Sequence, residues 1–219
     1  MTAMNPGKTI FLAGARRGVG RAIAEQLAAQ NSGSVYALLR NRDVEAELSA
    51  LGLKLCWGDA LDYGTVEQAI AAASPVDVII STIGGLPEDQ QGDRADYLGN
   101  KHLIDAAVAC QVKRFILISS IGAGSSAEAL PEQAMSVLKP VLIEKEKAEA
   151  HLLASGLIYT VIRPGGLRTA PATHQAALTD NPLASGIIHR ADVAELVCSA
   201  LSNPETYNRV FSAVDPSLT

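Results

Sequence analysis

Nearly continuous apolar runs limit the folds that this chain can adopt more strongly than any other feature of its sequence. The segments VDVIIS (76–81) and FILIS (115–119) show no strict alternation of polar and apolar residues. Strands of this kind are buried on both faces, as in a parallel sheet that helices cover on either side. Because such strands alternate with predicted helices along most of the chain, we expect a doubly wound α/β fold in a single domain, residues 1–219.

The predicted elements follow one another as strand and helix. The strands are Thr9–Ala13, Ser34–Leu39, Leu53–Trp57, Val76–Ser81, Phe115–Ser119, Ile158–Arg163 and Arg209–Ala213. The helices are Val19–Gln30, Asp43–Leu51, Tyr63–Ala73, Leu98–Gln111, Leu138–Ser155 and Ala191–Ser202. Three segments fit neither element, at about 82–97, 122–137 and 166–190, and each follows the carboxyl end of a strand. Ligands bind at this edge of an open parallel sheet, so we expect these segments to be substrate loops.

The first predicted strand leads into a glycine-rich turn, FLAGARRGVGRAIAEQL. Residues without a Cβ adopt positive φ angles, and they let backbone N–H groups and a helix N-terminus approach a pyrophosphate. The turn lies between a strand and a helix, which favours a dinucleotide-binding Rossmann domain over a plain glycine-rich turn. The predicted phosphate loop consists of Gly14, Arg16, Arg17, Gly18, Val19 and Gly20.

The end of the second predicted strand distinguishes between the two nicotinamide cofactors. About 20 residues past the glycines, an NAD site places Asp or Glu against the ribose hydroxyls. Arg40 occupies this position here, with Arg42 beside it, and Arg17 lies in the glycine-rich turn itself. A guanidinium group matches the geometry of a 2′-phosphate, so we expect NADP(H) as the cofactor. The alternative is that these are ordinary surface arginines at a strand end.

Composition excludes several classes of function. The formal net charge of -5 and the 4% of aromatic residues disfavour nucleic-acid binding. The chain shows neither an apolar run that could span a membrane nor a signal peptide. Cys56, Cys110 and Cys198 fit neither a disulfide framework nor a zinc site, so we expect a cytoplasmic protein without a metal. The oligomeric state is left open.

Further motifs give a resemblance that covers nearly the whole chain. They are GARRGVG, WGDALD, STIGG, YLGNKHLIDAA, KRFILISSIGAG, KAEAHLLASGLIYTVIRPGGL and IHRADVAELV. Together they resemble the short-chain dehydrogenase/reductase superfamily in its atypical branch. The second half is similar to biliverdin-IXβ reductase/flavin reductase, and also to NmrA-like and chloroplast-translocon-type NADP-binding proteins.

This resemblance implies further contacts with the cofactor. It implies Asp59 and Ala60 at the adenine, Thr82, Ile83 and Gly84 on the ribose side, Ser119 and Ser120 near the nicotinamide, Pro164 and Gly165 closing over it, and Lys145 at a ribose.

The catalytic tyrosine of the superfamily is absent from this chain. In the YxxxK pair, Lys145 takes the lysine position and the tyrosine position falls on Val141. Loss of a positioned proton donor costs about 10²–10⁴-fold in rate, which disfavours alcohol dehydrogenation and sugar epimerisation. Hydride transfer to a conjugated acceptor, such as a flavin, bilin or quinone, remains, because such an acceptor can take its proton from water.

Two functions remain open on the sequence. The first is an NADPH-dependent reductase with Ser120 and Lys145 as its catalytic residues. The second is a non-catalytic NADP(H)-binding redox sensor that reports to a protein partner. Each candidate residue also has a structural interpretation: Ser120 can satisfy backbone groups at a strand end, and Lys145 can pair with Glu149 on a helix surface. A pocket at the nicotinamide would favour the enzyme, because a sensor needs no site for an acceptor.

Overall fold

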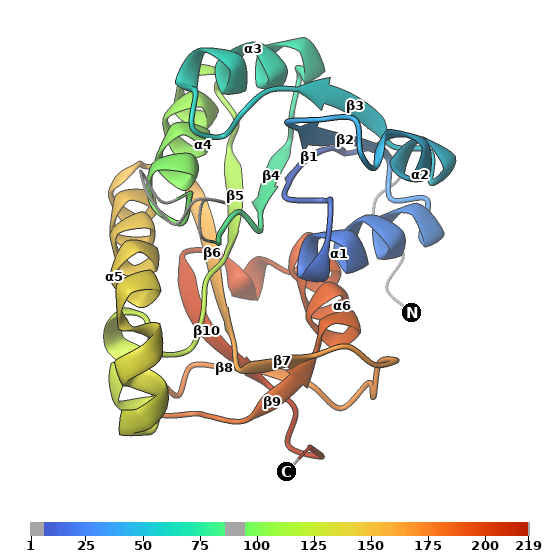
Figure 1. Cartoon of the computed structure of the whole chain (residues 1–219). Helices are drawn as coiled ribbons and strands as arrows, with labels where there is room; N and C mark the ends of the chain where they lie inside the picture. The colour runs from blue at the N-terminus through green and yellow to red at the C-terminus, as the bar shows by residue number, and fades with distance from the viewer. Residues whose placement is uncertain (1–6, 86–94, 219) are drawn as a thin grey trace.

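The computed structural model describes residues 7–85 and 95–218, which form an α/β fold around one central sheet (Figure 1). The strands are β1 Thr9–Ala13, β2 Ser34–Leu39, β3 Lys54–Trp57, β4 Val78–Ser81, β5 Arg114–Ile118, β6 Ile158–Pro164, β7 Gly166–Arg168, β8 Ala177–Thr179, β9 Ile187–His189 and β10 Arg209–Val214. The helices are α1 Gly18–Ala29, α2 Glu45–Ala50, α3 Tyr63–Ala73, α4 Leu98–Ala109, α5 Glu132–Ala154 and α6 Arg190–Ala200, with 3-10 helices η1 Gly124–Ala129 and η2 Pro204–Thr206.

The strand order of the main sheet is β3-β2-β1-β4-β5-β6-β10-β8. Ile10 of β1 lies in register with Val35 of β2 on one side and with Val78 of β4 on the other, and all three strands are parallel. Only β8 runs antiparallel, beside β10. The chain moves outward from β1 in both directions, so the carboxyl ends of β1 and β4 form a topological switch point, where ligands of such folds bind.

Helices cover both faces of this sheet, as the apolar strands predict. Ile23 and Leu27 of α1 pack with α6 on one face, around Ile10 and Leu12 of β1. The helices α3, α4 and α5 cover the other face, where Phe11 of β1 belongs to the second core cluster (Figure 1). Alternate residues of a single strand therefore enter opposite cores, which is why β1 carries no polar residue between Ile10 and Ala13.

The doubly wound α/β fold is confirmed, and the predicted strands and most helices agree with the structure to within two residues at each end. The prediction of 122–137 as a loop is wrong in part, because it contains η1 and the first turns of α5. Pro131 stands at the N-cap of α5, where its fixed φ and missing N–H cost little. The segment 166–190 also contains three short strands, β7, β8 and β9, which are too short to show a periodic pattern.

Part of the first predicted substrate loop, residues 86–94, lies outside the described residues. Within the part of the chain that is described, no helix is both long and apolar enough to cross a bilayer.

Candidate cofactor and acceptor site

The glycine-rich turn between β1 and α1 is folded tightly on itself. Gly14 and Gly18 adopt left-handed conformations, with φ angles of 96° and 59°. A Cβ on Gly20 would lie 2.1 Å from the carbonyl oxygen of Gly14, and a Cβ on Gly14 would lie 2.2 Å from Oγ1 of Thr82. The Thr82 hydroxyl follows β4 and donates to the carbonyl oxygen of Ala13 at 3.1 Å. The predicted glycines are therefore required by the backbone of this turn.

The start of α1 is open to an anion. Its N-cap residue, Arg17, makes no capping hydrogen bond, and its first turn holds no acidic residue. By contrast, α3 is capped by Asp62, which accepts from the backbone N–H of Thr65. Around Gly18 there is open space, since in the described part of the chain, its own neighbours and helix backbone aside, a Cβ there would have only Nε of Arg190 within 4 Å. The uncapped N–H groups and the positive end of the helix dipole fit the pyrophosphate of a dinucleotide.

The other two members of the predicted phosphate loop have partners of their own. Arg16 forms an ion pair with Asp43 at 3.2 Å, and both side chains are exposed. Val19 is buried in the core beneath α1, so only its backbone remains for a ligand. Among the described residues Arg17 forms no ion pair, and its charge stands at the edge of the loop. Arg17 is thus better placed than Arg16 to meet a phosphate.

The predicted adenine side lies where β2 and β3 end. Arg40 directly follows β2, and its Nη1 lies 4.0 Å from a carboxylate oxygen of Asp59. Arg42 pairs instead with Glu45 at 2.9 Å and covers the ring of Trp57, with Cζ 4.6 Å from the ring centroid. Arg40 therefore lies beside Asp59, past the end of β3, whereas Arg42 contacts Glu45 of α2 and Trp57 of β3.

Ala60 and Ile83 are held in place by side chains of α4. The Ala60 carbonyl lies 2.9 Å from Nδ1 of His102, which donates to it. Nδ2 of Asn100 donates to the Ile83 carbonyl at 3.2 Å, and its Oδ1 accepts from the Ser81 hydroxyl at 2.6 Å. The ends of β3 and β4 are thus fixed by a helix from the opposite side of the site.

Lys145 reaches the same edge of the sheet from α5. Its Nζ lies 3.3 Å from Oδ1 of Asp96, whose side chain is completely buried just before α4. The other Asp96 oxygen accepts from the backbone N–H of Gly85 at 3.1 Å. A Cβ on Gly84 would lie 3.1 Å from Lys145 Nζ, so the lysine touches the predicted ribose side. The alternative pairing with Glu149 is wrong.

Glu149 instead belongs to a buried ion pair one turn further along α5. Its carboxylate accepts from Nη2 and Nε of Arg163 in β6, at 2.6 and 3.1 Å, and both side chains are 6% exposed. The Ser119 hydroxyl donates to the same carboxylate, and Nη1 of Arg163 donates to Ser125 at 2.9 Å. This network fixes the face of α5 that carries Lys145 against the ends of β5 and β6. The Ser119 hydroxyl is therefore committed to Glu149.

Ser120 and Val141 occupy the positions on which the choice of reaction depends. Ser120 is half-buried just past β5, and its hydroxyl donates to the carbonyl of the next residue, Ile121, at 2.9 Å. Val141 is half-buried one helical turn before Lys145, on the same side of α5. This edge of the sheet therefore carries the Ser120 hydroxyl, which is bonded to a backbone carbonyl, and the Lys145 ammonium group. The tyrosine position carries the isopropyl group of Val141.

Residues 166–190, called the wall segment below, close the far side of this edge. Pro164 is the buried last residue of β6. A Cβ on Gly165 would lie 2.3 Å from the carbonyl oxygen of Gly186, and the backbone N–H of Gly166 donates to the same oxygen at 2.9 Å, so the start of the wall segment contacts its last part. Two of its strands, β7 and β9, pair with each other and stand apart from the main sheet.

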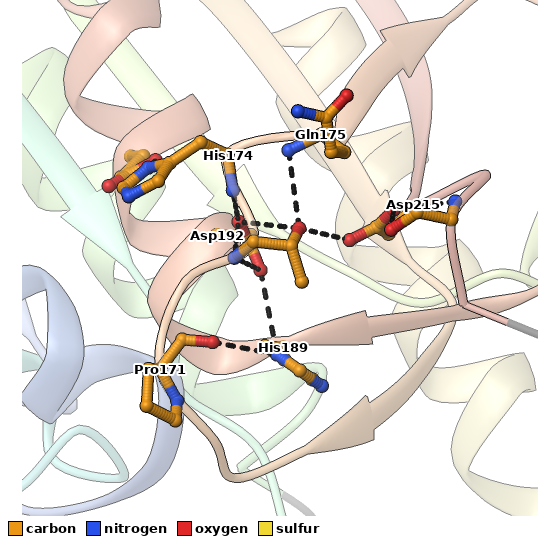
Figure 2. A network of polar contacts seen from close by, with 9 residues as sticks. Pro171, His174, Gln175, His189, Asp192 and Asp215 are labelled. Carbon is orange, nitrogen blue, oxygen red and sulfur yellow. Dashed lines mark hydrogen bonds and ion pairs between the residues drawn. The ribbon is translucent and has the colours of Figure 1, made fainter.

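Two buried carboxylates hold the wall segment in place, as Figure 2 shows. Asp192, in the first turn of α6, accepts from the backbone N–H groups of Thr173 and His174, each at 2.9 Å. The Thr173 hydroxyl donates to Asp215, which follows β10. His189 donates to a backbone carbonyl at 2.8 Å from the other side of this loop. The wall segment is thus fastened to α6 and to the end of the sheet.

The cysteines are placed away from this chemistry. Burial raises the pKa of the Cys198 thiol to about 12 and raises the pKa values of Cys56 and Cys110 as well. A raised pKa leaves less thiolate, so these thiols are poor nucleophiles. Among the described residues, no group of His, Cys, Asp or Glu is arranged to hold a metal ion.

A parallel sheet whose order reverses beside β1, with an uncapped helix start behind a glycine-rich turn, defines a dinucleotide-binding Rossmann protein. Residues 14–204 match the NAD(P)H-binding protein family. The chain belongs to this family, within the atypical short-chain dehydrogenases/reductases, and binding of NAD(P)H is the property that its members share. The resemblance found in the sequence is thereby confirmed.

Two of the proteins to which this chain is similar are named for different activities. The chain is similar to ChuY of Escherichia coli O157:H7, described as an anaerobilin reductase, with 34% identity, a TM-score of 0.88, and coverage of 97% of this chain and 99% of that one. It is 33% identical to the uncharacterized sugar epimerase YhfK of Bacillus subtilis, over 94% of each chain. It is also 37% identical to TIC 62 of Pisum sativum, over 66% of this chain and 28% of that protein's length.

Sequence reasoning missed the residues that position the site. Asp96 and Asn100 anchor Lys145 and Ile83, and Glu149 and Arg163 lock α5 to the sheet. A signal was present for Glu149, since a residue four positions after Lys145 shares its helix face. Asp96 gave no comparable signal, because its role depends on a contact with a helix far along the chain.

Proposed function

We propose that this protein is an NADPH-dependent reductase that transfers hydride to a flat, conjugated acceptor such as a flavin, bilin or quinone. The observation that carries this proposal is the combination of a well-positioned Lys145 with Val141 one turn earlier. The ammonium group is held at the sheet edge by buried Asp96, which supports the proposed role of Lys145 at the cofactor ribose. The isopropyl group of Val141 cannot donate a proton, so acceptors that need one from the protein are disfavoured.

The nicotinamide supplies the hydride when the cofactor is bound. Gly18 and the uncapped start of α1 hold the pyrophosphate, and Arg17 and Arg40 face the 2′-phosphate. Ser120 orients the acceptor through its hydroxyl, whose partner among the described residues is a backbone carbonyl. The proton comes from solvent, since the tyrosine position of the YxxxK pair is occupied by Val141. The wall segment encloses the acceptor.

Similarity to ChuY supports an acceptor of this kind. That protein is described as a reductase of a bilin, anaerobilin, and it is matched over nearly the full length of both chains. The similarity to YhfK does not indicate epimerisation here, because the residue that moves the proton in that chemistry is replaced by Val141. We therefore assign the cofactor as NADPH and the partner as a conjugated small molecule.

An anaerobic NADPH-oxidation screen tests this proposal. The purified protein is mixed with NADPH and, in separate assays, with FMN, a water-soluble quinone, a linear tetrapyrrole and a simple ketone. We expect oxidation of NADPH with at least one conjugated acceptor and negligible turnover of the ketone. A protein that binds NADPH and yet reduces none of the conjugated acceptors would contradict an enzymatic role. Such a result would favour a redox sensor, in line with the similarity to TIC 62.

A further inference from the structure

A cavity of about 680 Å³ opens between the start of α1 and the start of α6. Its lining is basic, with Arg17 and Arg21 on the side of α1 and Arg190 on the side of α6. Thr169 of the wall segment and Gly18 of the phosphate loop also line it. The cavity therefore joins the phosphate loop to a part of the chain more than 140 residues away in sequence.

Arg21 is neutralised within this cavity, while Arg190 is not. The Arg21 guanidinium bonds to Glu25 at 2.7 Å and to Glu47 at 2.9 Å. Nη1 of Arg190 donates to the Thr169 hydroxyl at 2.8 Å and lies 3.4 Å from a backbone carbonyl of β7. Within residues 7–85 and 95–218, Arg190 contacts no carboxylate, and its Nε and Nη2 make no hydrogen bond. The guanidinium is thus fixed in direction by neutral oxygens and keeps its charge.

The Arg190 guanidinium also lies close to the phosphate loop. Among the described residues, and apart from the chain neighbours of Gly18 and the backbone of α1, its Nε is the one atom within 4 Å of the position that a Cβ on Gly18 would occupy, at 3.8 Å. Gly18 is the first residue of α1, where the uncapped N–H groups point out of the helix. An anion on this helix start would lie between those N–H groups and Arg190.

We propose that Arg190 binds the pyrophosphate of the cofactor from the side opposite to α1. A guanidinium offers a planar pair of donors that matches two phosphate oxygens, and Nε and Nη2 form such a pair. Because the same guanidinium holds Thr169, the bound pyrophosphate connects the wall segment to the phosphate loop. This inference rests on the NAD(P)H binding of the family and does not depend on which acceptor is reduced.

The test measures cofactor binding in the absence of any acceptor. NADP⁺ and NAD⁺ are each titrated calorimetrically into the native protein and into Arg190→Gln. Since both dinucleotides carry the pyrophosphate, we expect the Kd values of both to rise by the same factor, about tenfold. A substitution at Arg40 would instead raise mainly the Kd of NADP⁺. The matched control is Arg209→Gln, which removes an exposed arginine at the start of β10 that pairs with Asp180 and does not line the cavity.

Two further variants cover the case in which Arg190→Gln does not fold. Arg190→Lys keeps the charge but loses the paired donors, so we expect a smaller loss of affinity for both dinucleotides. Thr169→Val keeps the whole guanidinium and removes the hydroxyl that directs it, and we expect a similar small loss. Unchanged Kd values for both dinucleotides in the folded Arg190 variants would overturn the proposal. Unchanged Kd values together with a raised KM for an acceptor would assign Arg190 to the acceptor instead.

Discussion

Nζ of Lys145 lies 3.3 Å from Oδ1 of Asp96. The lysine that we expect at the cofactor ribose is therefore held by a buried carboxylate just before α4. The contact joins α5 to the residues that precede α4, and the backbone at Gly84 and Gly85 lies against it. The position of the ammonium group is therefore set before any ligand arrives. Such prior positioning reduces the ordering cost of binding.

Replacing Asp96 by Asn tests this anchoring. We expect Asp96→Asn to weaken NADPH binding by about tenfold, because the neutral amide no longer holds Lys145 at the sheet edge. Calorimetric titration measures the effect. The matched control is Asp105→Asn, which removes a carboxylate of α4 that pairs with Lys101 and His151 instead. Equal affinities for the native protein and Asp96→Asn would show that Lys145 is not positioned by this contact.

The choice between NADP(H) and NAD(H) is expected to depend on Arg40 and Arg17. We expect the native protein to prefer NADP(H) by at least about tenfold, equivalent to about 1.4 kcal/mol. Arg40→Asp reverses the preference, since a carboxylate repels the 2′-phosphate and accepts from ribose hydroxyls. Competition titrations with both cofactors check this, and Arg42→Gln is the control because Arg42 is engaged with Glu45 and Trp57. Identical curves for the two cofactors in the native protein would disprove the assignment.

The glycines of the phosphate loop have separable roles. Gly18→Val is expected to abolish cofactor binding and to cost only about 1–2 kcal/mol in stability, because its φ of 59° is left-handed but the space around it is open. Gly20→Ala is expected to cost about 3 kcal/mol, since its Cβ would lie 2.1 Å from a backbone oxygen and the turn must shift. Denaturant unfolding and titration separate the two effects.

Gly52→Ala serves as the control for these glycine variants. Gly52 has a φ of 81° with no atom within 4 Å of an added Cβ, and it lies between α2 and β3. We expect Gly52→Ala to lower stability through backbone strain and to leave cofactor binding unchanged. Retained affinity in Gly18→Val would place the phosphate site elsewhere.

Ser120 and Val141 test the proposed mechanism. We expect Ser120→Ala to lower turnover of a conjugated acceptor by roughly tenfold, because the hydroxyl orients the acceptor and does not supply its proton. NADPH deuterated at the transferred position slows turnover where hydride transfer limits the rate. Val141→Tyr restores the proton donor of the superfamily beside Lys145, so we expect it to raise activity on simple ketones. Negligible ketone turnover by Val141→Tyr would argue against aligning Val141 and Lys145 with the YxxxK pair.

The buried pair Arg163–Glu149 predicts a large effect on stability. Glu149→Gln leaves the guanidinium buried without its counter-charge, which is expected to cost about 3–5 kcal/mol. For a domain of this size, such a loss lowers the Tm by roughly 10 °C. Glu144→Gln is the control, because its pair with Lys147 is open to solvent, with side chains 21% and 51% exposed, and contributes about 0.5 kcal/mol or less. Thermal unfolding of the two variants measures the difference, and equal Tm values would contradict it.

The fold could be predicted from the sequence because its signals are local. The apolar runs of β4 and β5 require burial on two faces, and Val19, Ile23 and Leu27 recur at helical spacing on α1. The wall segment was predicted as a loop because β8 is only three residues long and forms through pairing with β10. Pairing with a distant strand leaves no periodic pattern in the sequence.

The candidate site could be predicted only in part, for a similar reason. The glycine turn and Arg40 follow from a strand-turn-helix context that lies within one stretch of sequence. Asp96 contacts Lys145 and Arg163 contacts Glu149, both on α5, while Arg190 contacts Thr169. The topology alone brings these partners together. Arg42 stands beside Arg40 in the sequence, and in the structure its contacts are with Glu45 and Trp57.

The contact between Arg42 and Trp57 has a spectroscopic consequence. Trp57 is the single tryptophan in the chain, and it is 40% exposed. The Arg42 guanidinium lies over its ring, and Asp59 follows it by two residues in the sequence. Indole emission responds to a nearby charge and to solvent, so we expect a nucleotide bound beside Asp59 to change the intensity or colour of the emitted light. The protein therefore carries an intrinsic fluorophore close to the predicted adenine end of its site. Occupancy of that end can be followed without a label in variants altered at the distant phosphate loop or at α6.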